Sequence, residues 1–182
     1  MSAFVAFLRG VNMTGHNKIK MTDLVSLMKK AGFKDAETFI QSGNVIFSNP
    51  DELTEKEIVS KIEAAIHTKY GYNVTAVVRS EKEVRDVIAL NPFLSESDFN
   101  PAKMAVLFLT EHPSPDQIIK VAKVDYPPDK FQISGSEIFI YCPNGFGKTK
   151  LYTNFFENKM KVVGTARNWN TVNKTLEIAE KK

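Results

Sequence analysis

The sequence is poor in cysteine: Cys142 is the only one in 182 residues, so no disulfide can form within the chain. This excludes a small secreted fold held together by disulfides and favours a reducing compartment. No apolar run approaches the roughly 20 residues needed to cross a bilayer, and Arg9 interrupts the apolar N-terminal run, so neither a membrane span nor a signal peptide is expected. We therefore expect a cytoplasmic protein without a membrane partner.

Histidine is also scarce, and the three copies, His16, His67 and His112, lie far apart in the sequence. With a single cysteine they form no metal-ligand spacing, and no Ser-His-Asp order or nucleophile elbow is present. We expect no metal site and no cofactor. Glu157 and His16 are the only candidates for general acid–base chemistry, and a lone Glu is usually an ion-pair partner.

Charge of one sign is not concentrated anywhere. The net charge is only +3, and neither half of the chain carries the polybasic arm that is typical of a dedicated nucleic-acid domain. What the chain does have is apolar material: 43% of residues are hydrophobic, with thirteen Phe. This is enough to fill the cores of two packed lobes.

The first half of the sequence reads as strand, helix, two strands, helix, strand, which is the ferredoxin-like order. The helix starts are marked by Thr22 and by the capping box Thr54–Glu57, and Gly32 and Gly71 mark the helix ends. Period-2 and short apolar runs predict the strands at 3–8, 38–41, 45–47 and 74–78.

The second half repeats this order, so we predict an α+β protein of two ferredoxin-like (βαββαβ-type) halves with antiparallel sheets covered by helices. Residues 39–47 (FIQSGNVIF) parallel residues 131–139 (FQISGSEIF), and residues 4–8 parallel 105–109, which indicates internal duplication. We expect a first half at 1–80, a linker helix and loop at 81–102, and a second half with a C-terminal helix at 103–182.

One group of polar residues is expected to meet in the first half. In a ferredoxin-like half the loop after the first strand and the turn of the hairpin lie at the same edge of the sheet. Arg9, Asn12 and Lys18 should therefore lie beside Ser42 and Asn44. Cations with amides and hydroxyls can hold an anion or a phosphate. Alternatively, the glycines of these loops serve backbone geometry and Arg9 pairs with a carboxylate.

A second candidate is the glycine-rich turn at 143–150, which contains Lys148, Thr149 and Lys150. Its end resembles a P-loop, but Cys142 stands where the first Gly belongs and the preceding strand belongs to a hairpin. We expect a helix to begin near Thr149, so that free N–H groups and the two lysines favour an anion. A solvated turn is the alternative.

The third candidate is the segment Arg167, Asn168 and Trp169, which holds the only tryptophan. Trp can stack on a base or a sugar while Arg and Asn bind edges or phosphates. Alternatively, Asn168 caps the last helix and Trp169 is a packing residue. An RNA-recognition module shares the βαββαβ order, but residues 42–48 lack its aromatic motif.

Taken together, these motifs resemble the bacterial domain-of-unknown-function 1697 family. The resemblance rests on the ordered segments 8–12 (LRGVN), 15–18 (GHNK), Met21, 41–45 (QSGNV), 147–151 (GKTKL) and 165–172 (TARNWNTV). The family often carries Arg where this chain has Lys148, which keeps the charge but loses a planar fork. The resemblance implies a duplicated α/β plait and supplies no mechanism.

The leading hypothesis from the sequence is a binding protein for a phosphate-bearing ligand, either a small metabolite or nucleic acid. An enzyme acting on a small phosphorylated or acidic substrate is one alternative, and a structural or interaction module is another. Whether the motifs of the two halves converge on one site is left open. The residues expected to bind the ligand are Arg9, Asn12, Lys18, Ser42, Asn44, Lys148, Thr149, Lys150, Arg167, Asn168 and Trp169.

Overall fold

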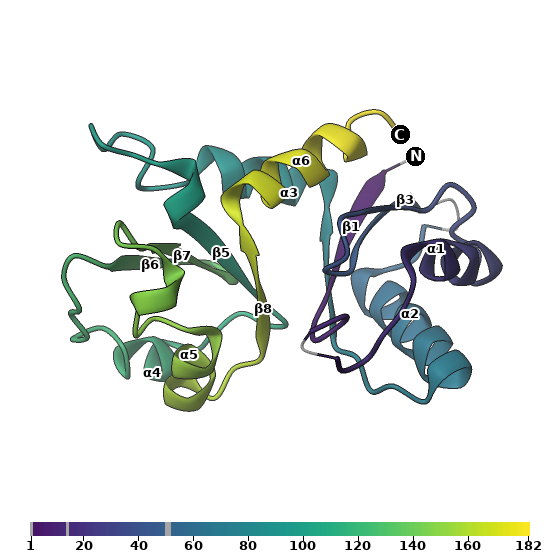
Figure 1. Cartoon of the computed structure of the whole chain (residues 1–182), viewed down its shortest axis with the longest axis horizontal. Coiled ribbons are helices and arrows are strands. Elements are labelled where there is room, and N and C mark those ends of the chain that lie inside the picture. The colour runs from purple at the N-terminus through teal and green to yellow at the C-terminus, as the bar shows by residue number, and fades with distance from the viewer. Residues whose placement is uncertain (1, 14, 50–51) are drawn as a thin grey trace. The chain divides into compact units, whose positions relative to one another are not determined.

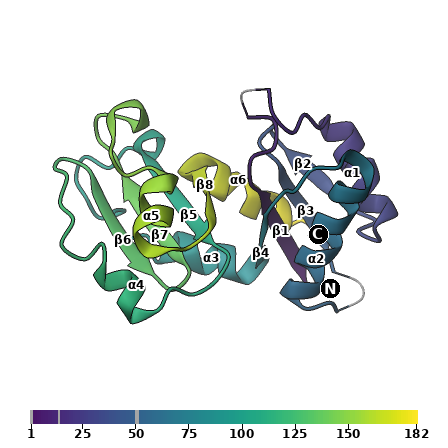
Figure 2. The same ribbon diagram turned by 90° about the horizontal axis from the view of Figure 1, so that it is seen from below.

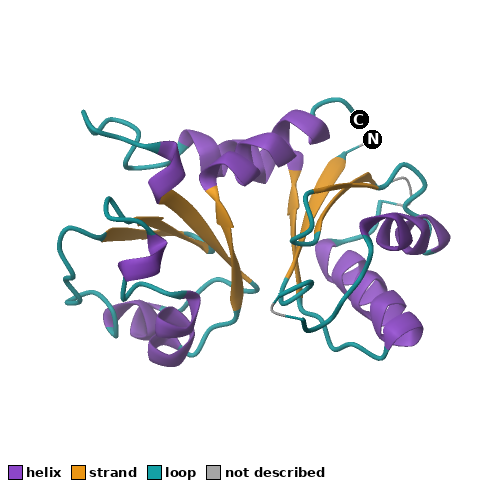
Figure 3. Ribbon diagram, viewed as in Figure 1, coloured by secondary structure: helices purple, strands orange, loops and turns teal. Residues whose placement is uncertain are grey.

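A computed structural model describes residues 2–13, 15–49 and 52–182. Contacts divide the chain into two units, Met1–Asp86 with Asn173–Lys182 and Val87–Val172. Each unit has its own sheet (Figure 1; coloured by element type in Figure 3). The boundaries at residues 80 and 102 stay predictions, because the division by contacts falls inside two helices, α3 (Glu81–Ala89) and α6 (Trp169–Ala179).

The first unit has a four-stranded antiparallel sheet in the order β2-β3-β1-β4. Two helices, α1 and α2, lie on one face of it (Figure 1). This order and this covering are those of the predicted ferredoxin-like half, so the predicted fold class is confirmed. The elements are β1 (Ala3–Leu8), α1 (Met21–Lys30), β2 (Glu37–Phe39), β3 (Asn44–Ser48), α2 (Glu55–Tyr70) and β4 (Ala76–Ser80).

The second unit repeats this architecture with the strand order β6-β7-β5-β8. Helices α4 and α5 cover one face, as Figures 1 and 2 show from two directions. Short 3₁₀ turns span Pro101–Lys103 and Phe146–Lys148. The remaining elements are β5 (Met104–Leu109), α4 (Pro115–Ile119), β6 (Lys130–Ser134), β7 (Glu137–Tyr141), α5 (Thr153–Met160) and β8 (Gly164–Asn168).

Alternate residues of each strand build the two cores, because successive side chains of a strand point to opposite faces. In the first unit, Val45 and Phe47 of β3 join Ile58 and Ile62 of α2 in one buried cluster. The corresponding cluster of the second unit includes Ile138 and Ile140 of β7 with Phe156 of α5. Burial of such side chains stabilises the fold by roughly 1.5–3 kcal/mol each.

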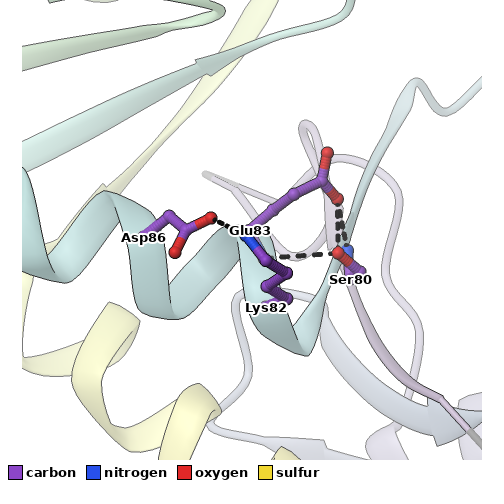
Figure 4. A network of polar contacts seen from close by, with 4 residues as sticks. All are labelled: Ser80, Lys82, Glu83 and Asp86. Atoms are coloured by element: carbon purple, nitrogen blue, oxygen red, sulfur yellow. Dashed lines mark hydrogen bonds and ion pairs between the residues drawn. The ribbon is translucent and has the colours of Figure 1, made fainter.

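Capping boxes start three of the helices as the sequence predicts. Thr54 and Glu57 cap α2, and Ser114 and Gln117 cap α4. At α3, the Ser80 N–H and hydroxyl both donate to Glu83 Oε2 at 2.7 Å (Figure 4). These bonds outweigh partial burial and hold the pKa of Glu83 below its ordinary value of 4.5.

Figure 4 also shows the ion pair of Lys82 with Asp86 one turn along α3.

The predicted cap at Thr22 is wrong. Helix α1 begins at Met21, its N-cap residue is Lys20, and no side chain caps it. The Thr22 carbonyl instead lies inside the helix, where it accepts a hydrogen bond from the Ser26 hydroxyl.

The duplication is visible in the register of the sheets. Val5 of β1 pairs with Arg79 of β4, and Val106 of β5 pairs with Arg167 of β8. The two hairpins, however, are offset by one residue from the match of residues 39–47 with 131–139. That match sets Ile46 against Ile138. In the structure Val5 pairs with Ile46, whereas Val106 pairs with Phe139. The turns also differ in length: four residues separate the paired ends of β2 and β3 (40–43), and two separate those of β6 and β7 (135–136).

Candidate functional site

In the first unit, the loop after β1 and the hairpin turn between β2 and β3 do meet, as the sheet order requires. The Leu8 N–H donates to the Gly43 carbonyl at 2.8 Å. The Asn12 side chain donates to the Gln41 carbonyl at 2.9 Å. Gly43 has φ +76°, and an added Cβ would lie 2.9 Å from the Leu8 Cβ. Only glycine fits this close approach.

The amides expected to bind a ligand there are occupied by the protein itself. Asn12 adopts φ +56°, donates to the Ile19 and Gln41 carbonyls, and accepts from the Ile19 N–H at 2.8 Å. Asn44 is fully buried, and its amide nitrogen donates to the Phe39 carbonyl and to the Ser42 hydroxyl. These side chains therefore shape the two loops.

The two cations of this loop are placed differently. The Arg9 side chain is half-buried, and its backbone N–H donates to the Thr75 carbonyl at 2.8 Å. Lys18 is exposed to solvent. The loop thus presents positive charge, while most of its directional hydrogen-bonding groups are already used within the chain.

In the second unit, the turn after β7 does not open a helix, and the expectation of a helix near Thr149 is wrong. A single 3₁₀ turn spans Phe146–Lys148, and α5 begins only at Thr153, after the N-cap residue Tyr152. Thr149 is buried, and its hydroxyl accepts from the Leu151 N–H at 2.9 Å. An N-terminal helix dipole is therefore absent from this turn, and any anion affinity depends on side chains.

The lysines of the turn do share a hollow. A cavity of about 270 Å³, termed the lysine hollow, is lined in part by Asn144, Lys148 and Lys150. Both lysines are exposed, and within the described part of the chain neither forms an ion pair. The rest of the wall consists of Asp125, Tyr126, Pro127, Pro128 and Asp129.

A third ammonium lies beside the same turn. The Lys103 Nζ is 3.2 Å from the position that an added Cβ at Gly145 would take. The Lys150 Nζ lies 5.2 Å from the centre of the Tyr126 ring, a cation–π contact. Lys103, which precedes β5, thus adds a positive group beside the turn that carries Lys148 and Lys150.

The base of the turn is fixed by buried groups. Cys142 is fully buried, and its N–H donates to the Lys103 carbonyl at 2.9 Å. Burial raises the pKa of the Cys142 thiol above its ordinary 9.0, although a hydrogen bond with Thr149 opposes the shift. The thiol therefore stays protonated at neutral pH and serves as a packed, unreactive group.

Arg167, Asn168 and Trp169 lie at the end of β8 and the start of α6. Arg167 is 7% exposed and donates to the Thr165 hydroxyl and to the Ala166 carbonyl, both at 2.8 Å. Its burial lowers the pKa of the guanidinium to about 10. Trp169 is also buried, with its ring edge against Phe99, whereas Asn168 is exposed.

Sequence reasoning did not single out Arg79, the counterpart of Arg167 in the first unit. It is 8% exposed, occupies the equivalent register on β4, and donates to the Val78 carbonyl at 2.8 Å. An alignment of β4 with β8 would have revealed it. The alignment is hard to find from the sequence, because Val-Val-Arg-Ser (77–80) and Thr-Ala-Arg-Asn (165–168) share only the arginine.

The two candidates for acid–base chemistry lie in different surroundings. Glu157 accepts a hydrogen bond from the Gly164 N–H at 3.1 Å and so links α5 to β8. His16 is exposed in the loop after β1. Among the described residues, no group of three or more His, Cys, Asp or Glu could hold a metal ion, and no helix is long and apolar enough to cross a bilayer.

The fold defines an α+β protein built from two ferredoxin-like halves. The sequence matches the family described as Protein of unknown function (DUF1697) over residues 1–139, and the chain belongs to this family. A comparison with curated proteins found no match. The structure is similar to that of the conserved bacterial protein SP0830 from Streptococcus pneumoniae, with a TM-score of 0.78, 23% identity and 99% of each chain covered.

Proposed function

We propose that the second half of this protein binds a small phosphate-bearing ligand in the lysine hollow. The observation that carries the proposal is that Lys148 and Lys150 line one hollow, exposed and without an ion pair among the described residues. Two ammonium groups on one concave surface attract a dianion more strongly than dispersed surface charges do. Asn144 adds an amide donor.

The acidic wall narrows the kind of ligand. Asp125 and Asp129 line the same hollow as the lysines. Carboxylates repel a bare anion, but they accept hydrogen bonds from hydroxyl groups. The hollow therefore suits a phosphate ester whose organic part carries hydroxyls, such as a sugar phosphate, better than it suits inorganic phosphate.

The proposal is tested by thermal unfolding with ribose 5-phosphate, using ribose as the uncharged control. At about a hundred times its dissociation constant, a ligand of the folded state adds roughly 2.7 kcal/mol of stability. We expect ribose 5-phosphate to raise the unfolding midpoint of the native chain and of Lys120→Ala, an exposed lysine outside the hollow. The double variant Lys148→Ala/Lys150→Ala should lose the shift. Equal shifts in the native chain and this double variant, or none in the native chain, would contradict the proposal.

A further inference from the structure

A larger hollow adjoins the lysine hollow and shares part of its wall. It has a volume of about 410 Å³, within the range of about 300–1,000 Å³ found for small-molecule sites. Its apolar lining comes from the segment 118–124 and from strand β6. We term it the apolar groove, and its apolar residues are Ile118, Val121, Ala122, Val124, Phe131 and Ile133.

Three residues line both hollows, so the two hollows are direct neighbours. Asp125, Tyr126 and Asp129 stand in the walls of each. Lys148 and Lys150 line only the lysine hollow, the two carboxylates line both hollows, and the aliphatic side chains and Phe131 line only the groove.

We propose that the two neighbouring hollows together bind a nucleoside 5′-monophosphate, an inference that rests on the proposed function of the lysine hollow. The phosphate lies at Lys148 and Lys150, and the ribose lies beside the carboxylates of Asp125 and Asp129, which accept hydrogen bonds from its 2′- and 3′-hydroxyls. The base enters the apolar groove. This ligand class has an anion, a diol and a flat ring in the order that the wall provides.

The groove also contains a group that suits a base better than a hydrocarbon chain. Gln132 lines it, and its side-chain amide has both a donor and an acceptor. The ring atoms of a nucleobase present donors and acceptors at their edge, and their faces pack on aliphatic and aromatic side chains. A simple alkyl group would leave the Gln132 amide without a partner from the ligand.

The experiment is a calorimetric titration of the full chain with the four common nucleoside 5′-monophosphates, with ribose 5-phosphate and with the corresponding nucleosides. We expect at least one nucleotide to bind ten times more tightly, or better, than ribose 5-phosphate. The same nucleotide should bind ten times more tightly, or better, than its own nucleoside.

Variants separate the parts of the site. Ala122 is exposed and lines the groove, so Ala122→Gln narrows the groove without removing a core side chain. It should reduce nucleotide affinity at least fivefold and leave ribose 5-phosphate unchanged. Ile119→Gln is the matched control, because Ile119 is 66% exposed, lies three residues before Ala122 at the end of α4, and lines neither hollow. Asp125→Asn should reduce the preference for ribonucleotides over 2′,3′-dideoxynucleotides.

The outcomes distinguish the two proposals. If ribose 5-phosphate binds and no nucleotide binds more tightly, the nucleotide inference is wrong and the phosphate site stands. If neither binds, both are wrong. A nucleoside that binds as tightly as its monophosphate would overturn the nucleotide inference, since the groove would then act without the lysines. An Ala122→Gln variant that binds the nucleotide like the native chain would overturn the placement of the base.

Discussion

At the scale of single residues, several side chains predicted to bind a ligand instead hold the backbone in place. Asn12 and Asn44 use their amides to close loops, and Thr149 supports the backbone of the following residues. Residue type alone does not separate these roles, because an amide that binds a loop and an amide that binds a phosphate look the same in a sequence. Lys148 and Lys150 are different, since neither forms an ion pair among the described residues.

Gly43 gives a prediction at this scale. Gly43→Ala forces a left-handed backbone on a residue with a Cβ and places that Cβ 2.9 Å from the Leu8 Cβ and 3.3 Å from the Val11 Cβ. We expect a loss of about 2–4 kcal/mol in the free energy of unfolding, from backbone strain of about 1–2 kcal/mol and overpacking of similar size. Urea denaturation measures it.

Gly71→Ala is the control for this substitution. Gly71 has φ +70°, close to that of Gly43, but an added Cβ would meet nothing within 4 Å. It should cost only the backbone term of about 1–2 kcal/mol. Equal losses for the two variants would show that the contact between the loop after β1 and the hairpin turn does not restrict position 43.

At the scale of elements, the sequence predicted the order of the helices and strands well and the residues at which they begin and end less well. Strand and helix types followed from period and from capping boxes, because these signals are local. The start of α5 was missed by four residues, since Gly147 and Thr149 suggest a helix start while Thr149 in fact bonds the N–H of Leu151. The one-residue offset between the hairpins was missed because a match of residue types does not fix which residues pair across neighbouring strands.

The C-terminal end of the chain provides a prediction about element docking. The Lys182 Nζ, in the segment after α6, donates to the Asp35 carbonyl at 2.7 Å and lies 3.5 Å from Asp35 Oδ2. Partial burial would raise the pKa of Asp35, but hydrogen bonds from the Ser48 hydroxyl and N–H, with the charge of Lys182, hold it below its ordinary 3.8. The charged carboxylate therefore stabilises the fold.

Asp35→Asn should lower the free energy of unfolding by about 0.5–1 kcal/mol at pH 7, a small effect because the pair is partly exposed. A depressed carboxyl pKa contributes stability that is full above the unfolded value of 3.8 and is lost as the pH falls through the lower folded value. The difference between variant and native chain should shrink in that acid range. Glu111→Gln, an exposed loop carboxyl, is the control. A difference that is unchanged in acid would contradict the assigned role.

At the scale of the whole molecule, the duplicated fold was predictable and the use of its two halves was not. Both halves carry a glycine turn and nearby cations, so the sequence offered two equivalent anion sites. The structure distinguishes them: in the first unit the amides bind the backbone, and in the second unit Lys148 and Lys150 line an open hollow. This difference depends on which side chains the loops use for their own hydrogen bonds, and periodicity and composition do not reveal that.

The most direct measurement is an NMR titration of the ¹⁵N-labelled chain with ribose 5-phosphate, following each backbone amide. We expect saturable chemical-shift changes at the backbone amides of residues 125–129 and 144–150, and no change in the loops at 9–18 and 40–44. Changes centred on those first-half loops, or weak changes spread evenly over surface lysines, would contradict it.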